Sequence, residues 1–146
     1  MRALIAISAM LVSVFASAGE VDGKAISCDG GDYEFRRGRA ISWMIWVVSS
    51  KAVLSDYPDR ASKYYTSHTT VWWLDVSSKE NKPLEYTTTK WSLDRRTLAL
   101  TVTVDDEVTK KWNCEVYAVG DFKNMLEARR AETQRRVDEE MEDNKI

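Results

Sequence analysis

The sequence predicts a mainly β fold, an antiparallel barrel of about eight strands or a small sandwich, followed by a C-terminal α-helix. Three observations lead to this fold class. Residues 24–117 are rich in Val, Ile, Thr, Trp and Tyr, which fit a pleated sheet. Apolar and polar residues alternate there in short runs that turn residues separate. From residue 121 onward, the chain is dominated by Glu, Arg, Ala and Asp, a composition that favours a charged helix.

The clearest strand pattern lies in residues 85–117. Leucines and valines at positions 98, 100, 102 and 104 alternate with threonines and one alanine. Polar residues at 94–96 and 105–107 separate this run from its two neighbours. The segment therefore predicts a three-stranded antiparallel meander.

The first half of the chain is less regular. Short strands are expected at 25–28, 33–36, 41–48, 63–66 and 69–76, with a loop at 50–62 and a polar connection at 77–83. The run 41–48 is apolar on both faces, which favours a central strand or one covered on both sides.

A thin apolar stripe runs along the predicted C-terminal helix. Phe122, Met125 and Leu126 lie near its start, and charged residues dominate after Arg129. We therefore expect the first turns to dock on the β domain and the end of the helix to be solvated.

The first 18 residues have the pattern of a secretory signal peptide. Arg2 precedes an apolar run at 3–15, and Ala-Ser-Ala at 16–18 resembles a cleavage site. The run is too short to span a membrane. We expect a signal peptide at 1–18, an antiparallel β domain at 19–120 and a charged C-terminal helix at 121–146.

Composition narrows the partners of the exported chain. Without residues 1–18 the chain keeps 20 basic and 23 acidic residues, a net charge of −3, and no second long apolar run. This balance disfavours nucleic acid and membrane insertion. The expected location is periplasmic or extracellular, and the expected partner is an envelope protein or a glycan.

Two cysteines, Cys28 and Cys114, lie in the expected first and last strands. Because an exported chain matures in an oxidising compartment, we expect them to form a disulfide.

No motif predicts catalysis, a metal site or a cofactor. His68 is the single histidine, and no Gly-x-Ser-x-Gly elbow surrounds a serine. The acids at 105–107 are consecutive, which favours a solvated turn over a calcium loop. The 23 acidic residues leave a carboxylate-dependent hydrolase open as an alternative.

Aromatic residues carry the remaining functional signal. The chain has six tryptophans, and neighbours such as Trp72 and Trp73 must point to opposite faces of a strand. At least one of them then points outward unless the helix covers it. The candidate binding surface comprises Trp46, Tyr64, Tyr65, Trp72 and Trp73.

Two resemblances to known proteins accompany these patterns. The residues Asp94-Arg-Arg-Thr-Leu98, followed by Trp112-Asn-Cys114, resemble a DR-x-TL hairpin and W-x-C strand of small exported bacterial proteins of unknown function. This resemblance implies no activity.

The second resemblance is to MliC-type periplasmic inhibitors of c-type lysozyme. Residues 27–31 (Ser-Cys-Asp-Gly-Gly) are similar to their opening strand, and 61–65 with 71–73 to their loop and aromatic strand. The Ser-Gly pair of the inhibitory loop is missing, and the charged tail is additional. The resemblance implies a small antiparallel barrel and a lysozyme-inhibitor-like function.

The sequence thus favours a non-catalytic binding or inhibitor module that uses an aromatic surface. A carboxylate-dependent hydrolase and a structural component of an envelope assembly are the alternatives.

Overall fold

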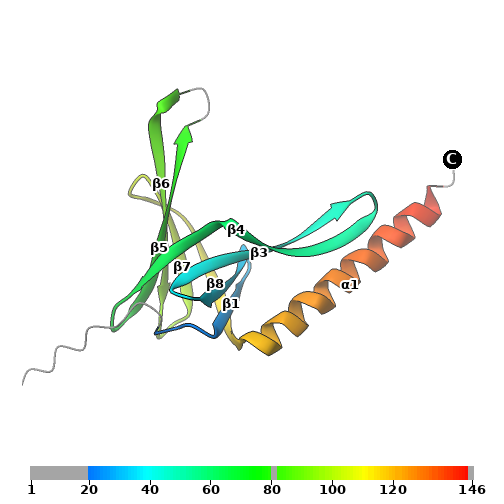
Figure 1. Cartoon of the computed structure of the whole chain (residues 1–146), viewed down its shortest axis with the longest axis horizontal. Helices are drawn as coiled ribbons and strands as arrows, with labels where there is room; N and C mark the ends of the chain where they lie inside the picture. The colour runs from blue at the N-terminus through cyan, green and yellow to red at the C-terminus, as the bar shows by residue number, and fades with distance from the viewer. Residues whose placement is uncertain (1–19, 80–81, 145–146) are drawn as a thin grey trace, which may run out of the picture.

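The computed structural model describes residues 20–79 and 82–144, so the expected signal peptide lies outside the described residues. The elements, in chain order, are β1 (Lys24–Cys28), β2 (Gly31–Arg36), β3 (Arg39–Val48), β4 (Lys51–Thr66), β5 (Thr70–Lys79), β6 (Lys82–Asp94), β7 (Ala99–Val104), β8 (Glu107–Ala118) and α1 (Val119–Asp143). Each strand pairs antiparallel with the next, and β8 pairs with β1, which closes an eight-stranded barrel. The predicted barrel and C-terminal helix are confirmed (Figure 1).

Alternating residues of the eight strands fill the barrel. Leu100 and Val102 on β7 are buried, as the period of two predicts. The core also contains Ile26, Cys28, Tyr33, Phe35, Ala40, Tyr64, Val71, Trp73, Leu93 and Cys114. The meander of β6, β7 and β8 is confirmed, with a register shift between Val102 and Thr103.

The predicted disulfide is present at the seam that closes the barrel. Cys28 and Cys114 are directly opposite each other in the β1–β8 pair, with Cα atoms 4.1 Å apart. Both residues are buried. A buried disulfide is typical of a protein that matures in an oxidising, exported environment.

Two hairpins extend beyond the barrel in different directions (Figure 1). β4 and β5 pair over three residue pairs, from Tyr64–Trp73 to Thr66–Val71, and then separate. We call residues 43–56 the β3–β4 arm, and residues 74–79 with 82–90 the β5–β6 arm.

The predicted loop at 50–62 and much of the predicted polar connection at 77–83 are wrong, because most of these residues belong to the strands that form the two arms. Residues 51–62 belong to β4, and residues 77–79 and 82–83 extend β5 and β6. The turn-forming residues around Pro58 lie where the β3–β4 register shifts between Ala40 and Ser42. An irregular stretch of this kind tolerates a proline, which cannot donate a ladder hydrogen bond.

The helix α1 packs on the outside of the barrel and along the β3–β4 arm (Figure 1). Phe122 and Leu126 are buried against Ala25, and Trp43 and Leu54 pack around them. The predicted docking of the first turns is therefore confirmed.

The docking continues further than expected and through polar groups. Gln134 accepts a hydrogen bond from the Ala52 backbone N–H at 2.8 Å and donates one to the Ser50 carbonyl at 3.0 Å. Arg129 donates to Asp32 and to the Ser27 hydroxyl. The expectation of a solvated helix from residue 129 onward is therefore wrong up to Gln134.

The helix covers the beginning of the apolar run at 41–48 on one side, whereas Val47 on the same side is 52% exposed. Trp43 lies on the helix side, whereas Met44, Trp46 and Val48 are exposed on the other face. Cover on both sides is therefore absent from the described part of the chain. The alternative, a central strand, holds for the start of the run, because β3 pairs with β2 up to Trp43 and with β4 along its length.

Candidate functional site

The five residues of the predicted binding surface lie in three different environments. Tyr64 and Trp73, which are paired across β4 and β5, both point into the barrel and are at most 3% exposed. Tyr64 contacts Phe35 edge-on and donates a hydrogen bond of 2.7 Å to Asp22. Their prediction as surface residues is wrong, because their strand positions place them in the core.

Tyr65 and Trp72 point outward, as the alternation along the strands requires. Their rings stack with centroids 4.5 Å apart and an interplanar angle of 22°. Lys63 Nζ lies 5.3 Å from the Tyr65 ring centroid, and Lys90 Nζ lies 5.0 Å from that of Trp72. We call Lys63, Tyr65, Trp72 and Lys90 the aromatic ladder.

The strand register explains why these four side chains meet. Tyr65 is directly opposite Trp72 in the β4–β5 pair, and Lys63 precedes Tyr65 by two residues on the same face. Leu74, which follows Trp72 by two residues, is directly opposite Lys90 in the β5–β6 pair. The ladder therefore crosses three strands on the outer surface of the barrel.

An apolar stripe continues from the ladder along the β5–β6 arm. Leu74, Val76 and Tyr86 lie on the same face as Trp72 and are 38%, 58% and 61% exposed. Positions 70–78 of β5 and 86–92 of β6 on this face, taken in steps of two, contain no acidic residue. We call the ladder with these three residues the ladder face. A contiguous exposed apolar surface with basic residues is typical of an interaction site.

Trp46 does not belong to the ladder face. It lies on the β3–β4 arm, opposite Val53 and on the same face as Met44 and Val48. These four side chains are exposed and face away from α1. The predicted surface thus divides into the ladder, the exposed face of this arm and the core.

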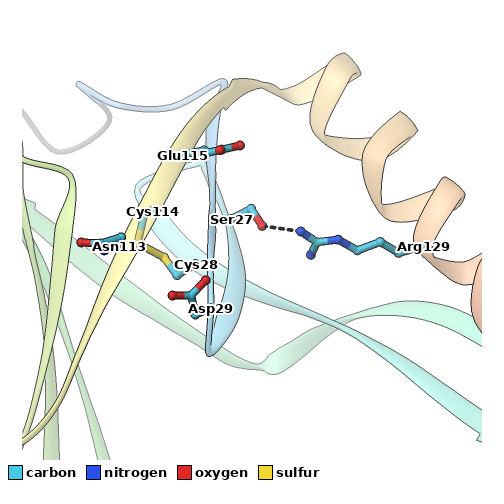
Figure 2. A pocket seen from close by; sticks show the side chains of 7 residues that line it. All are labelled: Ser27, Cys28, Asp29, Asn113, Cys114, Glu115 and Arg129. Atoms are coloured by element: carbon cyan, nitrogen blue, oxygen red, sulfur yellow. Dashed lines mark hydrogen bonds between the residues drawn. A yellow bond between two sulfur atoms is a disulfide. The ribbon is translucent and has the colours of Figure 1, made fainter.

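A polar pocket of about 470 Å³ lies beside the disulfide (Figure 2). Ser27, Asp29, Glu115 and Arg129 are among the residues that line it. Arg129 donates hydrogen bonds to the Ser27 hydroxyl, at 3.0 Å, and to the Asp32 carboxylate, at 3.1 Å. These bonds hold α1 against β1 and β2, which gives the arginine a structural role.

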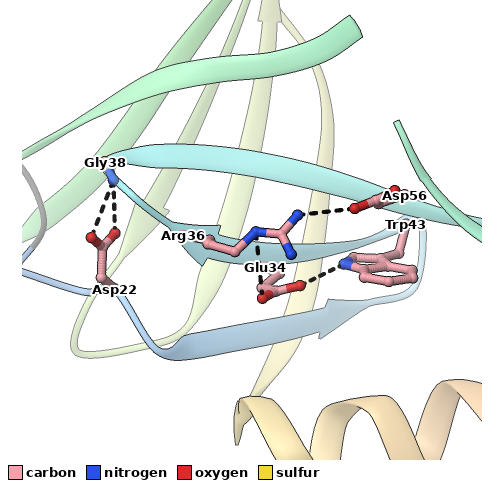
Figure 3. A network of polar contacts seen from close by, with 6 residues as sticks. All are labelled: Asp22, Glu34, Arg36, Gly38, Trp43 and Asp56. Atoms are coloured by element: carbon pink, nitrogen blue, oxygen red, sulfur yellow. Dashed lines mark hydrogen bonds and ion pairs between the residues drawn. The ribbon is translucent and has the colours of Figure 1, made fainter. Parts of the chain in front are cut away.

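A buried carboxylate, which sequence reasoning missed, anchors the base of the β3–β4 arm (Figure 3). Glu34 is 2% exposed and accepts a hydrogen bond of 2.9 Å from the Trp43 indole N–H. Arg36 lies 4.0 Å from Glu34 and 2.9 Å from Asp56. Burying a charge requires such partners, so this network links β2, β3 and β4.

Groups with catalytic or metal-binding potential are dispersed. His68 is exposed in the turn between β4 and β5. Within residues 20–79 and 82–144, no cluster of three His, Cys, Asp or Glu side chains is placed to hold a metal ion. No helix among these residues is long and apolar enough to cross a membrane.

Comparison with known protein families, curated proteins and solved structures finds no match to this chain. The two resemblances noted in the sequence therefore stay predictions.

Proposed function

We propose that this protein is an exported, non-catalytic binding module whose ladder face binds a protein partner with an acidic surface. The observation that carries the proposal is the aromatic ladder, an outward stack of two rings between two lysines. Aromatic residues are enriched at the centres of protein interfaces because they bury a large area with few rotatable bonds.

The geometry of the ladder favours a protein over a glycan. Sugars bind to the open face of an aromatic ring. Here Tyr65 and Trp72 stack on each other, and Lys63 and Lys90 lie over the rings. The ladder presents two lysine ammonium groups next to the apolar stripe. This combination matches acidic side chains around an apolar centre.

Export is supported by two independent features. The first 18 residues have a signal-peptide pattern, and the disulfide between Cys28 and Cys114 is buried. The proposed location is therefore the periplasm or the extracellular space.

Cross-linking through the ladder face tests the proposal. A photoreactive phenylalanine in place of Leu74 is introduced into the exported protein in its native host, and the illuminated cells are analysed for a cross-linked protein. We expect one dominant adduct, whose yield falls as the ionic strength of the medium rises.

Charge reversal supplies the matched controls. The double variant Lys63→Glu/Lys90→Glu should lose the adduct, whereas Lys51→Glu, at the tip of the β3–β4 arm, should keep it. Circular dichroism checks that all variants are folded. An adduct that persists in the double variant, or that disappears equally in Lys51→Glu, contradicts the proposal.

A further inference from the structure

A small cavity lies at the mouth of the barrel, where the two arms separate. Its volume is about 90 Å³, which is enough for a small organic group or a few water molecules. Three aromatic rings, two hydroxyls and one carboxylate line it, from Tyr33, Ser42, Ser62, Trp73, Asp75 and Trp91. This cavity is on the inside of the barrel wall, opposite to the ladder face.

The aromatic side chains form two differently oriented walls. The ring planes of Trp73 and Trp91 are nearly parallel, at 6°, with centroids 6.2 Å apart. Tyr33 is tilted by 58° to Trp73, at 5.1 Å. Burial raises the pKa of Tyr33 to about 12, so its phenol is neutral at physiological pH. The negative quadrupoles of these neutral rings attract a cation, so the ring faces alone supply this part of the binding.

Asp75 adds a full negative charge beside these rings. It follows Trp73 by two residues on β5, so both side chains share the inner face of the strand. The carboxylate is half-buried, and no hydrogen-bond or ion-pair partner for it is found among the described residues. Lys90, on the neighbouring strand, points to the opposite face, where it contacts Trp72.

We propose that this cavity binds a primary alkylammonium group. Aromatic faces and a carboxylate attract a cation, and the Ser42 and Ser62 hydroxyls with Asp75 can accept its N–H hydrogen bonds. A neutral alcohol of the same size carries no charge, so it gains neither the attraction to the aromatic faces nor the attraction to the carboxylate. An ammonium group of this kind occurs in free amines and in lysine side chains of proteins.

The cavity also predicts the shape of the ligand. Met44 and Trp46 follow Ser42 along the same face of β3 and leave the barrel on the β3–β4 arm. An alkyl chain behind the ammonium group would lie against these apolar side chains, while a volume of about 90 Å³ excludes a large head group.

Nuclear magnetic resonance titration of the purified, disulfide-bonded protein tests this proposal. The probes are propylammonium chloride, a lysine-containing tripeptide and the neutral analogue 1-propanol. We expect the indole N–H signals of Trp73 and Trp91 to shift saturably with propylammonium or the peptide, and not with propanol at equal concentration. The tighter of the two cationic probes identifies the source, a free amine or a lysine side chain.

Two variants test whether Asp75 supplies the negative charge that binds the ammonium group. Asp75→Asn should weaken propylammonium binding at least tenfold, whereas Asp106→Asn, in the exposed β7–β8 turn, should leave it unchanged. Equal shifts with propylammonium and propanol in the wild-type protein overturn the proposal even if a variant fails to fold. Unchanged binding in folded Asp75→Asn also overturns it.

Discussion

The disulfide at the barrel seam should supply a large part of the stability of this domain. Replacing both cysteines (Cys28→Ala/Cys114→Ala) removes a link between residues separated by 86 positions. Both positions are buried, and the apolar alanine side chain leaves no polar group there without a partner. The five registered pairs between β1 and β8 can still form in the folded state. The main effect should therefore be a gain of freedom in the unfolded chain.

The size of the effect follows from loop closure. For a loop of this length the chain-entropy relation gives about 4–5 kcal/mol at 25 °C. Small domains are stable by about 5–15 kcal/mol, so the variant should fold but with a small margin. At about 4 °C for each kcal/mol in a domain of this size, the melting temperature should fall by about 15–20 °C.

Differential scanning calorimetry of the variant and the wild-type protein measures this shift. The wild-type protein is also scanned in the reduced state, and its thiols are alkylated only after it has unfolded. This reduced sample should melt close to the variant. A decrease in melting temperature of less than about 5 °C would show that loss of the disulfide adds little conformational freedom to the unfolded chain. The loop-closure estimate would then be wrong for this barrel.

Three further predictions concern the core, the helix and pH. Leu100→Asp should prevent folding, because an unpaired carboxylate at a fully buried position costs several kcal/mol; Thr101→Asp, on the outer face, is the control, and the yield and melting curve are measured. Gln134→Ala removes two hydrogen bonds to the β3–β4 arm and should cost about 1–3 kcal/mol locally, seen as faster hydrogen exchange at the Ala52 amide with unchanged exchange in β7. Burial raises the pKa of Tyr33 to about 12, so the stability that its neutral form provides is complete below pH 10 and lost as the pH rises through 12. Urea unfolding at pH 9 and 11.5 should show this loss in the wild-type protein and a smaller one in Tyr33→Phe.

The features that followed from the sequence are those with strong local signals. The alternation that ends at Val104 specified both faces of β7, because the inner positions are apolar and the outer ones are two threonines and Ala99. Cys28 and Cys114 could be paired because the chain has two cysteines and a barrel brings its first and last strands together. The charged composition after residue 121 was sufficient to predict the helix.

The candidate surface was harder to predict because its pairs of neighbours are ambiguous. Tyr64 and Tyr65 are equally suited to the core, as are Trp72 and Trp73, so periodicity cannot decide which member points inward. The register decides it, through contacts such as the hydrogen bond from Tyr64 to Asp22. Those contacts join residues 42 positions apart, and no local pattern reveals them.

The β3–β4 arm escaped prediction for a related reason. Strand β4, which supplies the second half of the arm, also contains Pro58 and acidic residues that signal a turn. The arm packs against a helix that begins more than 60 residues later. Gln134 contacts the backbone of this arm. In the sequence, it is not distinguished from the other long polar side chains of the helix. Tertiary contacts therefore overrode the local signals.

The β5–β6 arm differs from its neighbour in what supports it. The β3–β4 arm lies against α1. By contrast, residues 76–79 and 82–88 pair with each other beyond the ends of the β4–β5 and β6–β7 strand pairings. A two-stranded hairpin without further packing is marginally stable in water. The exposed stripe of Leu74, Val76 and Tyr86 should therefore gain order when a partner covers it. Hydrogen exchange at 75–78 and 86–88 should be fast in the free protein and slow after cross-linking at the ladder face. Slow exchange in the free protein would mean that the hairpin needs no partner for its stability.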